Sequence, residues 1–205
     1  MSELSQGALL LGIRGEPLIL ASLSPRRREL LRLLAIRHEV MVPEVSEGDR
    51  GVDEPAERYV ERLAGAKARW VPREVHGYAV LAADTVVCLD GMVLEKPVDE
   101  DHARQLLRML SGRWHEVFTG VCLRRMGDGR TVAGYERSRV LFSRLSDAEI
   151  GRYVATGEPM DKAGAYGIQG FGGLLVQRIE GCYFNVMGLP LARLRRLAHE
   201  LEDGA

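Results

Sequence analysis

A run of three arginines, residues 26–28, stands where basic side chains are least expected. The surrounding stretch SPRRRELLRLL, residues 24–34, predicts a helix with Ser24 as its N-cap and Pro25 as its first residue. The first turn of a helix is the positive end of its dipole, where acidic residues are favoured. Because backbone N–H groups there bind anions and arginine grips phosphate through two hydrogen bonds, the run predicts an anion site. The alternative is a solvated basic turn, which Arg28 by itself fits.

Carboxylates and lysines elsewhere in the chain offer the other groups that phosphate chemistry needs. Asp84 follows apolar residues in a strand-like stretch, where a carboxylate is either a structural hydrogen-bond acceptor or a base and metal ligand. Lys67 falls on the apolar face of a predicted helix, although its stem could simply cover apolar surface, and Lys96 follows a predicted hairpin. Glu47 lies in an acidic loop, where solvation is the alternative. Jointly these groups suit the attack of water on a phosphoanhydride, assisted by a divalent cation.

A glycine-rich segment is the third feature that suggests ligand binding. Residues 161–173, DKAGAYGIQGFGG, contain five glycines, which let a backbone approach a ligand closely. Gln169 inside the segment can read a polar edge, whereas a flexible turn is the alternative. The segment matches neither the phosphate-loop nor the dinucleotide fingerprint, and the five histidines lack metal-ligand spacing. Ser22 and Ser24 stand outside any G-x-S-x-G elbow, so a serine hydrolase is not expected.

The elements that must position these residues alternate between strands and helices. Apolar runs predict strands over residues 17–22, 39–42, 116–124, 131–142 and 174–179, and helices over 55–70, 99–110, 146–157 and 190–201. In residues 78–97 the pair Asp90-Gly91 predicts a hairpin that sets Thr85 opposite Lys96. The pattern indicates one α/β domain over residues 17–205. Residues 1–16 are expected to form a frayed N-terminal extension.

Composition excludes several functional classes. The chain has 205 residues, of which 46% are hydrophobic and 28% charged, as in a folded domain with a real core. Its net charge of −1 argues against a nucleic-acid coat or a membrane-surface protein. The start is a poor signal peptide, and no apolar run reaches the roughly 20 residues that span a bilayer. The three cysteines lack metal or redox spacing, so we expect a reduced, cytoplasmic protein.

Six motifs in order resemble the Maf family of nucleoside triphosphate pyrophosphatases. They are LILASLSPRRRELL, AADTVV, LEKP, LSGRWHEVFTGV, DKAGAYGIQGFGG and YFNVMGLPL, within residues 18–197. The resemblance implies an α/β fold like that of inosine triphosphate pyrophosphatases, with a long, mixed, curved sheet flanked by helices and two lobes around a cleft. It also implies cleavage of a nucleoside triphosphate to the monophosphate and pyrophosphate, with Mg²⁺, Mn²⁺ or Co²⁺ as cofactor.

The form of the last two motifs is similar to the branch of the family that acts on dTTP and UTP. In that branch the position of Asp84 is the proposed proton acceptor. The positions associated with substrate choice match Arg26, Thr85 and Gln169. Further site positions of the family match Ser22, Arg27, Glu47, Lys67 and Lys96. The resemblance thus favours the functional alternatives for Lys67 and Glu47 over the structural ones.

The resulting hypothesis assigns each group a role. Arg26, Lys67 and Lys96 hold phosphate oxygens, Glu47 with Asp84 positions the metal ion, and Asp84 activates a water that attacks the α-phosphorus. A glutamine amide has a donor and an acceptor, so Gln169 can pair with a uracil or thymine edge, helped by Thr85. The sequence does not distinguish dTTP, UTP and modified pyrimidine nucleotides, since one methyl group contributes only about 1–3 kcal/mol.

Two other functions compete with this hypothesis. The hypothesis above implies an enzyme that removes non-canonical nucleotides. The family is also linked to septum formation and division arrest, so one rival function is a regulator that binds nucleotides without hydrolysing them. The other rival, a nucleic-acid-binding module, is disfavoured by the net charge and by the lack of interleaved aromatic residues. We expect no nucleic-acid or membrane partner, and the family resemblance favours a homodimer.

Overall fold

The computed structural model describes residues 4–45, 50–51 and 53–203. The chain divides into two compact units. Unit 1 comprises Met1–Asp84, Thr119–Glu136 and Gly188–Ala205, and unit 2 comprises Thr85–Phe118 and Arg137–Met187. None of the helices in the described ranges is both long and apolar enough to cross a membrane. The three cysteines, all of which are described, are free.

Seven strands form one mixed sheet in the order β2-β1-β3-β5-β6-β7, with β4 paired to β3. The strands are β1 (Leu18–Ala21), β2 (His38–Met41), β3 (Ala79–Leu89), β4 (Met92–Leu94), β5 (Trp114–Arg125), β6 (Thr131–Phe142) and β7 (Val176–Glu180). β1 pairs in parallel with β2 and β3, whereas β3–β4 and β6–β7 are antiparallel. The predicted α/β class, with a long mixed sheet flanked by helices, is confirmed.

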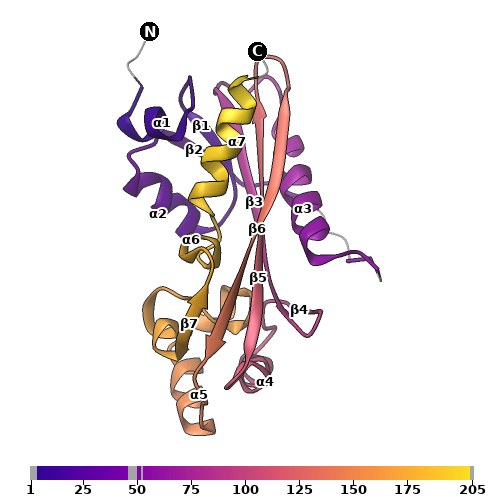
Figure 1. Cartoon of the computed structure of the whole chain (residues 1–205), viewed down its shortest axis with the longest axis vertical. Coiled ribbons are helices and arrows are strands. Elements are labelled where there is room, and N and C mark those ends of the chain that lie inside the picture. Colours follow the sequence, from indigo (N-terminus) through magenta and orange to yellow (C-terminus); the bar gives the residue numbers. More distant parts are fainter. Residues whose placement is uncertain (1–3, 46–49, 52, 204–205) are drawn as a thin grey trace. The chain divides into compact units, whose positions relative to one another are not determined.

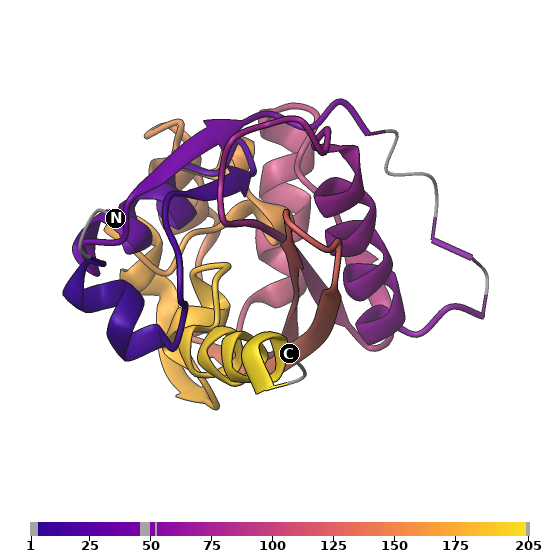
Figure 2. The same ribbon diagram turned by 90° about the horizontal axis from the view of Figure 1, so that it is seen from above.

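In unit 1, helices cover the strands on two sides. The helices are α1 (Gln6–Leu11), α2 (Pro25–Leu33), α3 (Ala56–Trp70) and α7 (Leu191–Asp203). The small residues Ala64 and Ala68 of α3 pack against alternate, buried positions of β1 and β3, such as Ile19 and Val80. Figure 1 shows α3 on one side of these strands and α1 and α7 on the other, and Figure 2 shows the same separation from above. Because successive side chains of β1 and β3 point to opposite faces of the sheet, these strands pack against helices on both faces.

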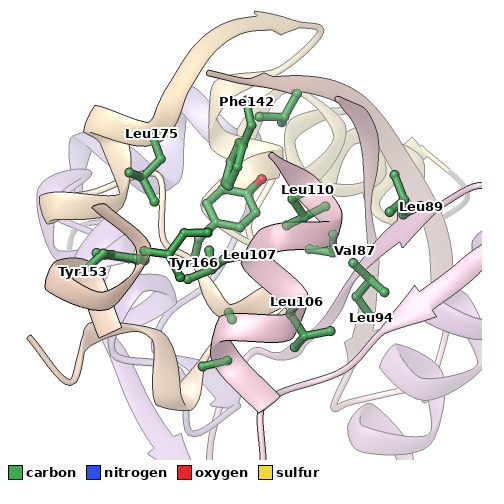
Figure 3. Packing of buried hydrophobic residues seen from close by; sticks show 14 of the residues in the cluster. Val87, Leu89, Leu94, Leu106, Leu107, Leu110, Phe142, Tyr153, Tyr166 and Leu175 are labelled. Carbon is green, nitrogen blue, oxygen red and sulfur yellow. The ribbon is translucent and has the colours of Figure 1, made fainter. Parts of the chain in front are cut away.

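Unit 2 is built around an apolar cluster with aromatic rings at its centre. Its helices are α4 (Glu100–Leu110), α5 (Asp147–Val154) and α6 (Tyr183–Val186), and the 3₁₀ turns η1 (Glu158–Asp161), η2 (Ala163–Ala165) and η3 (Gly170–Leu175) lie between α5 and β7. Tyr166 lies edge-on to Phe142, with ring centroids 4.7 Å apart, and leucines of α4 such as Leu107 pack in the same cluster (Figure 3). The glycine segment therefore includes core as well as loop, since Tyr166 belongs to it.

Most predicted elements are confirmed to within a few residues, but two expectations were wrong. Residues 5–16 are not frayed: α1 is capped by Ser5, and its Ala8 and Leu11 are buried where α1 contacts α7. The predicted N-cap position of Ser24 at the start of α2 is confirmed, although its side chain makes no capping hydrogen bond to this described helix.

The second correction concerns the hairpin. Leu89 pairs with Met92 as predicted, but the ladder ends at Val87 and Leu94, so Thr85 and Lys96 are not paired strand residues. The chain leaves the sheet because the carbonyl oxygen of Glu95 accepts a hydrogen bond from the Gly164 N–H instead, at 3.1 Å. Lys96 is exposed in the segment that follows β4.

Candidate active site

Arg27 ties together three segments of unit 1. Its guanidinium is buried: Nε donates to the Gly188 carbonyl oxygen at 2.7 Å, and Nη1 donates to Ser22 Oγ at 3.0 Å and to the Ala83 carbonyl oxygen at 2.8 Å. These acceptors lie after β1, within β3 and before α7. A planar guanidinium with several fixed donors suits such a junction. Arg27 therefore organises the site and is not presented to solvent.

Ser22 fixes the beginning of α2. Its Oγ accepts from the Ser24 N–H at 3.1 Å as well as from Arg27. The first N–H groups of a helix have no partner within the helix, so they face whatever lies beyond its end. At this turn Arg26 is half-buried and Arg28 is exposed, as expected for a solvated side chain. The three arginines thus differ in environment: Arg27 is buried, Arg26 is half-buried in the first turn, and Arg28 is exposed.

Lys67 and Asp84 form a close ion pair. Lys67 Nζ lies 2.5 Å from Asp84 Oδ1, with 13% and 11% of the respective side chains exposed. The pair forms because the apolar face of α3, including Leu63 and Ala64, packs on the sheet and carries Lys67 to β3. The ion pair therefore fixes the position of the Asp84 carboxylate beside a cation, in a partly buried place.

The residues predicted for the site fall into two groups. Unit 1 contains Ser22, Arg26, Arg27, Lys67 and Asp84, and unit 2 contains Thr85, Lys96 and Gln169. Thr85 follows Asp84 in β3 and is half-buried, and Gln169 is half-buried just before η3. Glu47 lies outside the described residues. Within unit 1, hydrogen bonds link Ser22 to Arg27, and Arg27 to the residue that precedes Asp84.

The donor chemistry at Asp84 suits a hard divalent cation only in part. A carboxylate oxygen is the ligand that Mg²⁺ prefers, but such a cation also needs further oxygen donors. Among the described residues there is no group of three or more His, Cys, Asp or Glu side chains able to hold a metal ion. Asp84 can therefore contribute to a metal site but does not complete one with its described neighbours.

Some functional groups could not be read from the sequence. The carbonyl oxygens of Ala83 and Gly188 become important only because Arg27 reaches them, and backbone acceptors leave no trace in residue type. Glu158 was also missed, although its carboxylate accepts hydrogen bonds from the backbone of η3. The glycines at positions 170 and 172 were the available signal, since close approach of a carboxylate to a backbone favours residues without a side chain.

Comparisons with known proteins agree on one family. The family model described as "Maf-like protein" matches residues 17–201. A dTTP/UTP pyrophosphatase of Symbiobacterium thermophilum is 55% identical over 178 residues, which cover 87% of this chain and 90% of the relative. The dTTP/UTP pyrophosphatases of Koribacter versatilis and Caldicellulosiruptor bescii are 50% and 46% identical, covering 89% and 91% of this chain and 93% and 98% of the relatives.

Proposed function

The chain belongs to the Maf family, and from this premise we propose that it is a nucleoside triphosphate pyrophosphatase acting on dTTP and UTP. The names of its similar relatives support both the reaction and the substrates. The observation that carries the proposal is the ion pair of Lys67 with Asp84, in a strand that Arg27 fixes through the adjacent carbonyl group. The ion pair and the contact from Arg27 to the preceding residue together hold the Asp84 carboxylate in one position close to cationic side chains.

The proposed reaction is hydrolysis at the α-phosphorus. A water molecule attacks that phosphorus, and Asp84 accepts the proton that the water loses. The bond between the α-phosphorus and the bridging oxygen breaks, and its electron pair leaves with pyrophosphate. Lys67 Nζ, 2.5 Å from Asp84 Oδ1, keeps the carboxylate oriented before the attack and balances its negative charge. The products are the nucleoside monophosphate and pyrophosphate.

Recognition of the substrate is assigned to the remaining predicted residues. We assign Arg26 and the N-terminus of α2 to the phosphates, because both offer donors to an anion in the half-buried first turn. Lys96 is assigned to the phosphates, and Thr85 and Gln169 to the pyrimidine base, by resemblance to the family. The choice among dTTP, UTP and modified pyrimidine nucleotides is part of the experiment below.

A divalent cation, Mg²⁺, Mn²⁺ or Co²⁺, is proposed as cofactor, with carboxylate ligands from Asp84 and Glu47. When bound, it would neutralise phosphate charge and make the α-phosphorus more electrophilic. We also propose a cytoplasmic location and a homodimer. The absence of disulfides among the three cysteines supports the first, and sedimentation at micromolar concentration would test the second.

Release of pyrophosphate from a panel of nucleoside triphosphates tests the proposal. The wild type is compared with Asp84→Asn and with Asp90→Asn, which alters an exposed carboxylate at the end of the same strand. Turnover of dTTP and UTP should survive in Asp90→Asn and fall by about 10²–10⁴-fold in Asp84→Asn. Binding of the triphosphates without any turnover by the wild type would refute the enzyme and support the nucleotide-binding regulator.

A further inference from the structure

Glu158 holds the backbone of the glycine segment. Its Oε1 accepts hydrogen bonds from the Gly172 N–H and the Tyr153 hydroxyl, each at 2.9 Å, and its Oε2 accepts from the Phe171 N–H at 2.9 Å. One carboxylate thus serves two consecutive backbone groups of η3. Hydrogen bonds to an ionised acceptor are stronger than those between neutral groups, so this contact restrains the segment firmly.

Tyr153 restrains the same segment at a residue that precedes Gln169 in the sequence. Its hydroxyl oxygen accepts from the Gly167 N–H at 3.3 Å while it donates to Glu158. The ring is 5% exposed and packs in the apolar cluster of unit 2 (Figure 3), so the hydroxyl is a fixed point. Gly167 precedes Gln169 and η3 follows it, so the two side chains hold both flanks of this residue.

The glycines of the segment permit this approach. Gly170 has a φ of 77°, and a Cβ there would lie 2.5 Å from Glu158 Oε2. A Cβ on Gly172 would lie 2.2 Å from the Gly167 carbonyl oxygen and 2.7 Å from Tyr153 Oη. Both distances are far below normal contact. The glycines therefore allow a tightly held loop, and the alternative of a flexible turn is disfavoured.

We propose that Tyr153 and Glu158 are positioning residues that fix the backbone around Gln169 and thereby set the base preference of the enzyme. The inference rests on the proposed function, in which the amide of Gln169 reads the pyrimidine edge. Neither residue is assigned a contact with substrate. An amide discriminates between bases only while its position is held to within about 0.5 Å. Loss of the hydrogen bonds that Tyr153 and Glu158 accept from the loop lets the Gln169 amide move. The residues of unit 1 that are assigned to hydrolysis stay chemically unchanged.

Two variants remove the hydrogen bonds with little change of shape. Glu158→Gln replaces one acceptor oxygen by an NH₂ group, which faces a donor. Tyr153→Phe keeps the buried ring and removes only the hydroxyl, so it preserves the test where Glu158→Gln fails to fold. Glu149→Gln is the matched control, because Glu149 also accepts two hydrogen bonds in unit 2, both from Ser146 at the start of α5.

The first readout is the ratio of kcat/KM for UTP to kcat/KM for CTP. The ratio should fall about tenfold in both variants, mainly through kcat/KM for UTP, and stay unchanged in Glu149→Gln. Gln169→Ala should lower it similarly, and adding Glu158→Gln to Gln169→Ala should lower it no further, because coupled residues are not additive. An equal loss for both nucleotides, or additive effects on the ratio, would show a merely structural role and overturn the proposal.

The second readout is independent of turnover. Amide hydrogen exchange over residues 167–173 should accelerate in Glu158→Gln and Tyr153→Phe but not in Glu149→Gln. Unchanged exchange would overturn the proposal, because the pair would not then hold the loop. A wild type that hydrolyses no triphosphate would overturn the proposed function and the role of Gln169 with it. An active wild type whose base preference survives in both variants would overturn the positioning role alone.

Discussion

Arg27 donates a 2.8 Å hydrogen bond to the carbonyl oxygen of Ala83, the residue immediately before Asp84. The same guanidinium reaches Ser22 and Gly188, so one side chain holds the end of β1, the middle of β3 and the segment before α7. The sequence suggested an anion site at this run of arginines and did not distinguish Arg27 from Arg26 in its local environment. In the structure, the central one is a buried scaffold for the proposed proton acceptor.

Arg27→Lys should therefore cost stability as well as activity. A single ammonium cannot span three acceptors that Nε and Nη1 reach together, so at least one buried carbonyl loses its donor. We expect the free energy of unfolding to fall by about 2–4 kcal/mol, measured by urea denaturation. Arg28→Lys, at the exposed neighbour, is the control and should change it by less than about 0.5 kcal/mol. Equal stability of the two variants would show that these three contacts do not fix the site.

The ion pair of Lys67 with Asp84 predicts opposite patterns for stability and activity. Lys67→Met or Asp84→Asn alone leaves a partly buried charge without its main partner and should destabilise the protein by about 1–3 kcal/mol. The double variant removes both charges and should recover much of that loss, while remaining as inactive as Asp84→Asn. Urea denaturation and pyrophosphate release measure the two effects. Additive destabilisation in the double variant would mean that the two side chains do not depend on each other.

His115 predicts a decline in stability as the pH falls. Burial lowers its pKa from 6.5 to about 4, and its ring lies edge-on to Phe142 with Nε2 2.8 Å from the Tyr166 hydroxyl oxygen. The unfolded chain takes up a proton below pH 6.5, whereas the folded protein does not until about pH 4. The contribution of His115 is therefore fully present above pH 6.5 and is lost progressively between these values.

The free energy of unfolding should fall by about 3 kcal/mol between these pH values if the full pKa shift contributes to stability. His115→Gln removes the titrating group and should flatten the melting temperature between pH 6.5 and 4, measured by calorimetry at constant ionic strength. His102→Gln, on the surface of α4, should keep the slope of the wild type. A His115 variant with the unaltered slope would assign the pH dependence to other groups.

Two glycines that look alike in the sequence should respond oppositely to alanine. A Cβ on Gly120 of β5 would lie 2.2 Å from the Val60 carbonyl oxygen of α3, so Gly120→Ala must push a helix off the sheet. We expect it to destabilise the protein by about 1–3 kcal/mol or more. Gly151 in α5 has no atom within 4 Å of an added Cβ, so Gly151→Ala should stabilise by about 0.5–1 kcal/mol. Thermal melts of both variants measure the difference, and a shift of the same sign in both would contradict the packing described.

Local signals in the sequence were sufficient for most of the elements from residue 17 onward and for some of their turns and caps. Asp90 and Gly91 adopt φ values of 51° and 80°, as a two-residue hairpin turn requires, and Ser146 and Glu149 form a capping box at the start of a predicted helix. These features depend only on neighbouring residues. The family resemblance supplied the rest of the site, because no local pattern distinguishes Lys67 from an ordinary lysine on an apolar helix face.

Features that depend on distant parts of the chain were not predictable in this way. The burial of Arg27 needs acceptors at positions 83 and 188, and the order of α1 needs α7, which follows some 180 residues later. The hairpin keeps the predicted register but its ladder ends before Lys96, where the Glu95 carbonyl oxygen accepts a hydrogen bond from Gly164 of the glycine segment. Hydrophobic periodicity reports which face of an element is buried but not which segment buries it.

The N-terminal extension provides the last prediction, since Glu16 joins it to β2. The buried carboxylate accepts hydrogen bonds from the N–H and hydroxyl of Ser5 and from the N–H and Nε of Arg37. Burial alone would raise its pKa, but these bonds outweigh burial and hold the pKa below the ordinary value of 4.5. A lowered pKa means that the carboxylate stabilises the fold above about pH 4.5 and loses this effect as the pH falls through the folded value.

Glu16→Gln should lower the free energy of unfolding by about 1–3 kcal/mol at pH 7, because an amide cannot accept four hydrogen bonds. The wild type and the variant should converge as the pH falls through the lowered pKa of the folded carboxylate, where the wild type becomes protonated. Glu29→Gln, an exposed position on α2, is the control and should leave stability unchanged at both pH values. Removal of residues 1–13 should be at least as destabilising as Glu16→Gln, since it also uncovers the side of α7 that contacts α1. A truncated protein as stable as the full chain would show that the extension does not stabilise the fold, as expected of a frayed segment.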